Sequence, residues 1–216
     1  MKKVAVLLDA GFVERRLYEM GDKRHVTASE LWSFAVGCAT PTEEILRIFY
    51  YDSPPLESQE QHPISGEKVN FAASGTAKRK AALHRELSQM NLVAFRAGRV
   101  NFDGWKLTLA ATKTAIKAVA AKETFHLEAR DVAPDIKQKR VDMMIGLDIA
   151  WLASKRLVDR LILVTADSDF VPAMKFARRE GVQVVLVPLK HKNLPSELRV
   201  HADEVRDISF PGADSA

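Results

Sequence analysis

Hydrophobic positions fall into two kinds of segment along the chain. Short, uninterrupted runs of aliphatic and β-branched residues are typical of strands buried on both faces of a sheet. Such runs predict strands at 4–8, 45–51, 92–95, 161–164 and 182–187, with a last one at 205–208. Segments with helical spacing predict helices at 10–20, 76–90, 141–153 and 170–180, and one that begins after Thr27 or Ser29. Because strands alternate with helices, the pattern predicts an α/β fold with a mostly parallel central sheet.

Three stretches do not follow this alternation. Residues 53–66 contain three prolines among polar residues, which predicts a loop. Residues 102–105, with the order Phe-Asp-Gly-Trp, predict a turn into a short strand. Residues 107–136 are ambiguous, although their alanine content favours a helix before Pro134. Residues 211–216 are expected to be a flexible tail behind a single domain at 1–210.

Length and composition narrow the class of protein. A chain of 216 residues with 47% hydrophobic residues suits one globular domain with a substantial core. The single cysteine, Cys38, excludes a disulfide framework and a four-cysteine zinc site, and we expect it to pack in the core. Apolar runs are shorter than the ~18 residues of a membrane span, and the first one ends at Asp9, too early for a signal peptide. We therefore expect a cytoplasmic protein without a membrane partner.

Charge is distributed unevenly. The net charge is +4, but residues 75–140 alone carry 14 basic and 6 acidic residues, a net charge of +8. Such a segment attracts polyanions, because it raises encounter rates and binds phosphates. The alternative is a basic face that only interacts with solvent.

Aspartates follow three of the predicted strands. Asp9 ends the first, Asp52 ends the second, and Asp167 and Asp169 follow the strand at 161–164. In open parallel sheets, ligands bind beyond the carboxyl ends of the strands. Carboxylates gathered there repel one another unless a cation or proton lies among them. Oxygen ligands suit Mg²⁺ or Mn²⁺ rather than zinc.

Structural roles are the alternative for each of these aspartates. Asp9 could cap the helix that follows it, and either Asp167 or Asp169 could cap the helix at 170–180. A helix needs only one capping residue, so capping explains either Asp167 or Asp169. The other is then available for a functional role. Asp52 could be a turn residue or a support for the site. Thr165 and Ser168 could orient water molecules on a metal ion, although hydroxyl residues are common in turns.

Two further aspartates lie in the apolar helix predicted at 141–153. An acidic residue in the first turn, such as Asp142, is favourable in any helix. Asp148 lies in the middle among apolar neighbours, which is costly unless it is paired. Six residues place the two about 240° apart around the helix axis, so they do not share a face. We expect Asp142 to be a metal ligand and Asp148 to support the site or the fold.

Several enzyme classes lack their motifs in this sequence. It contains no G-x-G-x-x-G, no G-x-x-x-x-G-K-[ST] and no H-E-x-x-H, which argues against dinucleotide cofactors, P-loop hydrolysis and zinc proteases. Asp9-Ala10-Gly11 lacks the second aspartate of an aspartyl-phosphate phosphatase. The six histidines are scattered, so a ribonuclease with two catalytic histidines is not supported.

Two motifs resemble those of the NYN domain, a family of PIN-like, Rossmann-related nucleases. They are Gln138–Asp142 with Ile145–Ala150, and Leu163–Pro172. The resemblance implies a PIN-like Rossmannoid three-layer α/β/α sandwich and hydrolysis of RNA phosphodiesters with Mg²⁺ or Mn²⁺. It also implies which residues are the catalytic metal ligands: Asp9, Asp142, Asp167 and Asp169.

The sequence departs from this family at three positions. Phe12 stands where many relatives carry asparagine, Arg140 where glycine is usual, and Ala166 where glycine is frequent. An aromatic ring cannot bind a phosphate or a metal-bound water as an amide would. Phe12 therefore favours an alternative, a non-catalytic RNA-binding or regulatory adaptor on the same scaffold.

Basic and aromatic residues supply the expected RNA contacts. Lys139 and Arg140 precede Asp142 and are expected to hold a phosphate near the reacting bond. Five further basic residues are expected to bind the RNA backbone on either side of the reacting bond: Lys78, Arg79, Lys80, Arg96 and Arg99. Trp105, Phe102 or Phe71 could stack on an exposed base, which favours single-stranded RNA as the partner. A homo-oligomer is the other partner left open.

Overall fold

The computed structural model describes residues 1–21 and 23–208. The chain divides into two compact units. The first comprises Met1–Ser53, Ala82–Gly98 and Arg140–Ala216, and the second comprises Pro54–Ala81 and Arg99–Lys139. The single domain at 1–210 stays a prediction, and the tail expected at 211–216 lies outside the described residues.

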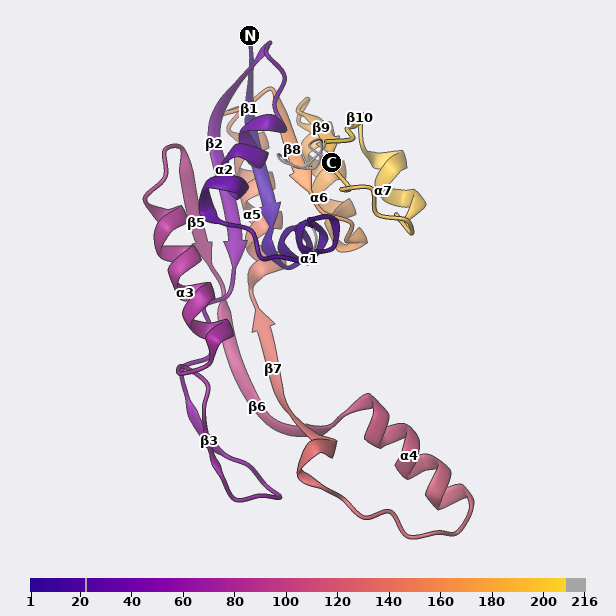
Figure 1. Ribbon diagram of the computed structural model, residues 1–216. Coiled ribbons are helices and arrows are strands. Elements are labelled where there is room, and N and C mark those ends of the chain that lie inside the picture. The colour runs from indigo at the N-terminus through magenta and orange to yellow at the C-terminus, as the bar shows by residue number, and fades with distance from the viewer. Residues whose placement is uncertain (22, 209–216) are drawn as a thin grey trace. The chain divides into compact units, whose positions relative to one another are not determined.

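A six-stranded sheet forms the centre of the first unit (Figure 1). Its strand order is β10-β9-β8-β1-β2-β5, and every neighbouring pair is parallel. The strands are β1 (Lys2–Asp9), β2 (Glu43–Asp52), β5 (Val93–Ala97), β8 (Arg160–Val164), β9 (Gln183–Leu186) and β10 (Glu204–Val205). This confirms the predicted α/β fold with a parallel sheet. The buried apolar runs form the inner strands, as expected for a sheet covered on both faces.

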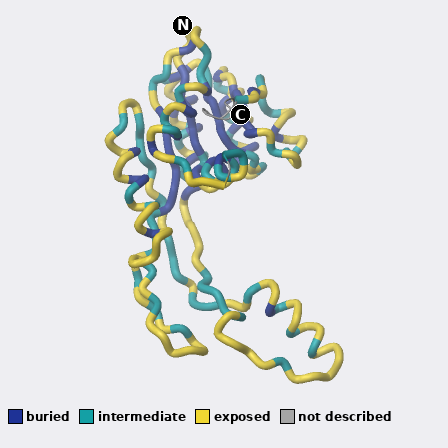
Figure 2. The backbone as a smooth tube through the Cα atoms, viewed as in Figure 1, coloured by how far each residue is buried: buried dark blue, intermediate teal, exposed yellow. Residues whose placement is uncertain are grey.

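Helices cover both faces of this sheet. They are α1 (Ala10–Met20), α2 (Ala28–Gly37), α3 (Gly75–Ser88, whose last residues belong to this unit), α5 (Val141–Ser154), α6 (Val171–Arg179) and α7 (Ser196–His201). Val6 and Leu8 of β1 pack in one apolar cluster with α1, α2 and the end of α3. Ala5 and Leu7 pack in a second cluster with α5, α6 and α7. This alternation produces three layers, and Figure 2 shows the buried backbone concentrated in the sheet.

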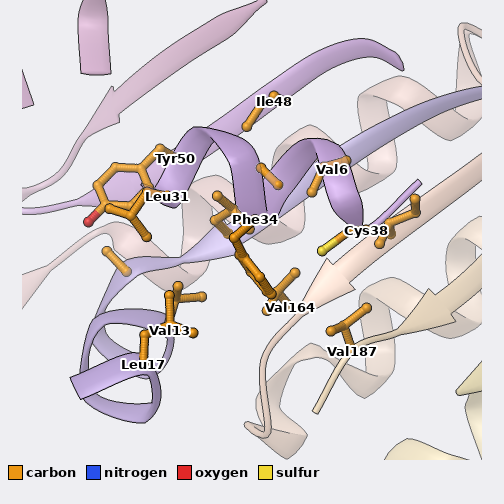
Figure 3. Packing of buried hydrophobic residues seen from close by; sticks show 14 of the residues in the cluster. Val6, Val13, Leu17, Leu31, Phe34, Cys38, Ile48, Tyr50, Val164 and Val187 are labelled. Atoms are coloured by element: carbon orange, nitrogen blue, oxygen red, sulfur yellow. The ribbon is translucent and has the colours of Figure 1, made fainter. Parts of the chain in front are cut away.

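The cluster on the α1–α2 side is tightly filled. Figure 3 shows Phe34 of α2 reaching toward Val164 of β8, with Cys38 close to Val6. Cys38 is 1% exposed, and burial raises the pKa of its thiol to about 12. The thiol is therefore a core group and a poor nucleophile, which agrees with the predicted packing role.

Helix starts follow local sequence signals. Thr27 caps α2, because its hydroxyl accepts from the backbone N–H of Glu30 while the Glu30 carboxylate accepts from Thr27 N–H. Arg140 precedes α5 with a left-handed backbone (φ 75°) that side-chain-bearing residues adopt at a cost. None of the helices in the described residues is long and apolar enough to span a lipid bilayer.

The second unit consists of antiparallel pairs and a helix. β3 (Gln59–Gln61) pairs with β4 (Lys68–Asn70), and β6 (Arg99–Leu107) pairs with β7 (Val132–Lys139). Between β6 and β7 lie α4 (Leu109–Ala120) and the 3₁₀ turn η1 (Ala129–Asp131). The helix favoured before Pro134 is confirmed as α4.

Two predictions for the second unit were wrong. The stretch 53–66 is not all loop, because Gln59–Gln61 forms β3; its polar sequence gave no apolar run to signal a strand. The turn at 102–105 is instead an irregularity inside β6, where the register shifts between Phe102 and Trp105. Gly104 provides the positive φ of 99° there, and the chain continues as a strand. Pro134 lies within β7, which a two-stranded ribbon tolerates.

A buried charge network holds the amino-terminal edge of the sheet in the first unit. The Glu43 side chain is 1% exposed and accepts from Arg160 Nη1 at 2.6 Å and from Arg206 Nη1 and Nη2 at 2.8 and 2.9 Å. Arg206 also donates to the Cys38 carbonyl at 2.9 Å. The Arg206 guanidinium lowers the pKa of Glu43 to about 2. The network therefore joins β2, β8 and the segment after β10.

This network predicts a defined loss of stability in acid. A folded pKa near 2 against 4.5 in the unfolded chain stabilises the fold by about 3 kcal/mol above pH 4.5, and this is lost as the pH falls toward 2. Glu43→Gln should lower the free energy of unfolding by about that amount at pH 7, measured by urea unfolding. Glu44→Gln, at the exposed neighbouring position, should be neutral. Equal stability of the two variants would contradict this assignment.

Candidate active site

The candidate site lies at the carboxyl edge of the sheet, where β1 pairs with β8. Leu8 is opposite Val164, so Asp9 and Thr165 follow side by side. The strand order changes direction here: β2 and β5 lie on one side of β1, and β8, β9 and β10 on the other. Such a switch point opens a crevice between the connections that leave on opposite faces.

Asp9 is held by both of its oxygens. Oδ1 accepts from Phe12 N–H at 3.5 Å, which caps α1, and Oδ2 accepts from the Thr165 hydroxyl at 3.1 Å. Thr165 is fully buried, and its Oγ1 also accepts from Asp167 N–H at 3.2 Å. Burial raises the pKa of Asp9, and the charges of Asp142 and Asp167 raise it further. Asp9 therefore caps α1, as the sequence allowed. It also lies close enough to two other carboxylates for their charges to raise its pKa.

Asp167 and Asp169 follow β8 in a tight turn. Asp167 caps the 3₁₀ turn η2 (Ser168–Phe170) by accepting from Asp169 N–H at 2.9 Å. Asp142 lies in the first turn of α5, as predicted. Partial desolvation raises the pKa of Asp142, with added repulsion from Asp167 and Asp169. The aspartates of these three segments therefore influence one another electrostatically.

A pocket of about 450 Å³ opens among these residues. The structure brings five of the predicted site residues to its wall: Asp9, Asp142, Thr165, Asp167 and Ser168. The other wall residues are Gly11, Phe12, Arg15, Ala166 and His191. Asp169 is absent from this wall, although its charge acts on Asp142. The amino ends of α1 and α5 meet the pocket, and their helix dipoles favour negative charge there.

The carboxylate oxygens of the pocket are suitable ligands for a hard divalent cation, but they do not lie close enough together to bind one in this arrangement. Over residues 1–21 and 23–208, no three His, Cys, Asp or Glu side chains lie close enough to hold a metal ion. The carboxylates nonetheless share one pocket, and the pKa values of Asp9 and Asp142 are raised there. A cation is the group that would relieve this repulsion, and carboxylate oxygens are the ligands that Mg²⁺ and Mn²⁺ prefer.

Two predicted supporting carboxylates have their own partners away from the pocket wall. Asp148 accepts from the Tyr51 hydroxyl at 2.9 Å and from Arg96 Nε at 3.0 Å. Arg96 also lies over the Phe49 ring, 5.3 Å from its centroid. Asp52 is buried and lies 2.7 Å from His84 Nε2. Both contacts join elements within the first unit, so each carboxylate has a structural role there.

Two polar residues of the pocket were missed by the sequence interpretation. Arg15 lies on α1, four residues after Gly11 and three after Phe12, and this helical spacing could have suggested it. His191 belongs to the loop after β9, and no local pattern predicts where that loop places it. Its ring packs against Phe12 with centroids 6.0 Å apart, and its Nδ1 is buried without a hydrogen-bond partner in the described chain.

The predicted RNA-binding residues are divided between the two units. Arg96 and Arg140 belong to the first unit, and Lys78, Arg79, Lys80, Arg99 and Lys139 belong to the second. By sequence, the first unit has 20 basic and 20 acidic residues, and the second has 12 basic and 8 acidic ones. The net charge of +4 therefore resides in the second unit.

The fold and the acidic pocket define a Rossmann-like α/β protein with its candidate site at the switch point of the sheet. Residues 69–209, more than half of the chain, match the NYN domain model. The chain therefore belongs to the NYN domain family, a family of PIN-like ribonucleases. The match includes Asp142, Asp167 and Asp169, whereas Asp9 precedes it.

A solved structure shares the fold. It is a protein of unknown function from Vibrio parahaemolyticus, with a TM-score of 0.51 and 17% sequence identity over 96% of this chain and 93% of that one. No curated protein matches the chain significantly in sequence.

The repulsion at the pocket predicts that removing a carboxylate stabilises the metal-free protein. Because the pKa of Asp9 is raised, its contribution is most favourable below pH 3.8 and is lost as the pH rises through the folded pKa. In EDTA, Asp9→Asn should match the wild-type Tm near pH 3 and exceed it at pH 7. The exposed Asp207→Asn should not change Tm. A lower Tm for Asp9→Asn at pH 7 would contradict the stated electrostatics.

Proposed function

We propose that this protein is a metal-dependent ribonuclease that hydrolyses RNA phosphodiester bonds at the acidic pocket. The observation that supports this most directly is that Asp9, Asp142 and Asp167, from three separate segments, line one pocket. Burial and, to a smaller extent, their mutual repulsion raise the pKa values of Asp9 and Asp142, so the arrangement costs stability. A cost of this kind is typical of functional sites. Membership of the NYN family agrees with this reaction.

The proposed ligands of Mg²⁺ or Mn²⁺ are Asp9, Asp142, Asp167 and Asp169. A bound ion lowers the pKa of a water molecule and neutralises charge on the phosphate. The residues of the chain set up this chemistry. Thr165 fixes the Asp9 carboxylate through Oδ2 and orients the turn at Asp167 through its backbone N–H. The Asp9 side chain and the backbone of Asp167 are thereby held by one hydroxyl, and the Asp167 carboxylate is held by the Asp169 N–H.

Positive groups at the pocket would position the RNA backbone. Arg15 is on the pocket wall, and Arg140 is two residues before Asp142. A guanidinium can donate two parallel hydrogen bonds to a phosphate, which fixes its orientation as well as its charge. In the proposed hydrolysis, water attacks phosphorus and the bond to the 3′ oxygen breaks. The products are a 5′-phosphate and a 3′-hydroxyl, and the 2′-hydroxyl takes no part as a nucleophile.

A non-catalytic RNA-binding adaptor is the second candidate, and Phe12 favours it. Phe12 is 5% exposed, and its ring forms part of the pocket wall against His191. The position thus supplies an apolar surface where an amide would offer a donor and an acceptor. An adaptor of this kind would bind RNA without affinity for Mn²⁺, which calorimetric titration of the metal measures directly.

Substitution of Asp142 tests the ribonuclease. Asp142→Asn should lower Mn²⁺-dependent cleavage of single-stranded RNA by more than about 100-fold, because loss of a direct ligand should exceed the usual effect of losing an outer partner. It should also reduce the rise in Tm that Mn²⁺ produces in the wild type. End analysis of the wild-type products should find 5′-phosphates.

Glu44→Gln is the matched control, since Glu44 is exposed at the amino-terminal edge of the sheet, opposite the pocket. It should retain both cleavage and the Tm response. Wild-type protein that binds RNA but neither binds Mn²⁺ nor cleaves would support the adaptor. Cleavage by Asp142→Asn at the wild-type rate would place the chemistry elsewhere.

A further inference from the structure

A second pocket, of about 320 Å³, lies wholly within the second unit. Three segments form it: the residues before β3, the stretch from the end of β4 into the start of α3, and the β6–β7 ribbon. Its apolar wall includes Pro55, Phe71, Val100 and Ile136, and its polar wall includes Lys80 and Gln138. The Ile136 side chain is 41% exposed, so apolar surface faces solvent here. The pocket is chemically unlike the acidic one, because no carboxylate lines it.

Phe71 is held in place by two other aromatic rings. Its ring centroid is 5.8 Å from that of Phe102 and 6.3 Å from that of Trp105, and these two are 5.7 Å apart. His62 packs edge-on against Trp105 at 4.6 Å. A ring already fixed by its neighbours loses little conformational freedom when a flat ligand stacks on it. Phe71 is thus a preorganised stacking surface.

The polar groups of the pocket match the edge and backbone of a nucleotide. The Gln138 amide offers both a donor and an acceptor, and the Thr76 hydroxyl offers the same. The Ser74 hydroxyl instead donates to the Phe71 carbonyl and accepts from Ala77 N–H, which fixes the backbone around Phe71. Lys80 brings a positive charge, and Lys78 and Arg79 precede it on the exposed side of α3. An uncharged aliphatic ligand would use none of these groups.

The net charge of the second unit indicates which class of ligand this pocket binds. The second unit holds the net charge of +4, whereas the first unit is neutral. A basic surface combined with an aromatic platform is the usual arrangement for single-stranded nucleic acid, because phosphates meet cations while bases stack. We propose that this pocket binds one unpaired base of the RNA, stacked on Phe71, with Lys80 contacting its phosphate. This rests on RNA being the substrate, as proposed above.

The proposed subsite makes the protein selective for single strands. A base inside a duplex is stacked on its neighbours and cannot enter a pocket without being unpaired. Any base can stack on an aromatic ring, so the subsite distinguishes single-stranded from double-stranded RNA more than it distinguishes one base sequence from another.

A thermodynamic cycle tests the subsite without any cleavage. Fluorescence anisotropy in EDTA, which prevents metal-dependent cleavage, measures Kd for a single-stranded RNA of about eight nucleotides. The intact RNA is compared with a series of RNAs that each lack the base at one position. Phe71→Ala should weaken binding of intact RNA by about 5- to 150-fold. Removing the captured base should weaken wild-type binding similarly and leave Phe71→Ala binding nearly unchanged. A 2-aminopurine at that position should be quenched by the wild type only.

The controls separate this proposal from the ribonuclease. Phe125→Ala removes a phenylalanine of the same unit that does not line the pocket and should bind like the wild type. Lys80→Gln should reduce the salt dependence of log Kd by about 0.7. If Phe71→Ala unfolds by circular dichroism, Gln138→Ala and Ile136→Gln replace it. Wild-type affinity in the Phe71 or the replacement variants overturns the subsite alone, and a wild type that binds no RNA overturns both proposals.

Discussion

Six strands running in one direction impose the constraint from which the site follows. Parallel pairing places all carboxyl ends at one edge, so residues that follow β1 and β8 become neighbours although they are far apart in sequence. Burial on both faces confines polar groups of the inner strands largely to the two ends of the strands, and the carboxyl ends form the edge with the pocket. Thr165 fixes the positions of these residues, because its single hydroxyl donates to the Asp9 carboxylate and accepts from the Asp167 N–H. The acidic pocket is therefore a product of topology rather than of any local motif.

Stability and function oppose each other at this edge. Asp9 caps α1 and Asp167 caps η2, which favours the fold, while burial and neighbouring carboxylates raise the pKa values of Asp9 and Asp142. At the other edge, Glu43 is buried but paired with two arginines, and its pKa is lowered. A carboxylate thus stabilises one end of the sheet and strains the other. The difference is that Glu43 accepts hydrogen bonds from two arginines, whereas Asp9 accepts them from the Phe12 N–H and the Thr165 hydroxyl.

Sequence patterns predicted the sheet of the first unit because its strands are apolar and continuous. They also placed Asp9, Asp142 and Asp167 together, since strand ends and helix starts have recognisable signals. They failed where structure does not depend on a buried face. β3 is polar throughout, and the irregularity at Gly104 resembled a turn because both need the same positive φ. The partners of Asp148 and Asp52 and the position of His191 depend on tertiary packing, which no single sequence pattern encodes.

The left-handed backbone at Arg140 combines backbone strain and a positive charge at one position. A glycine would adopt φ 75° without strain. An arginine here accepts roughly 1–2 kcal/mol of steric cost. In return, the residue entering α5 has a guanidinium two positions before Asp142. Backbone conformation and charge are therefore linked at the start of α5: replacing Arg140 with glycine would relieve the steric cost and remove the guanidinium in a single substitution.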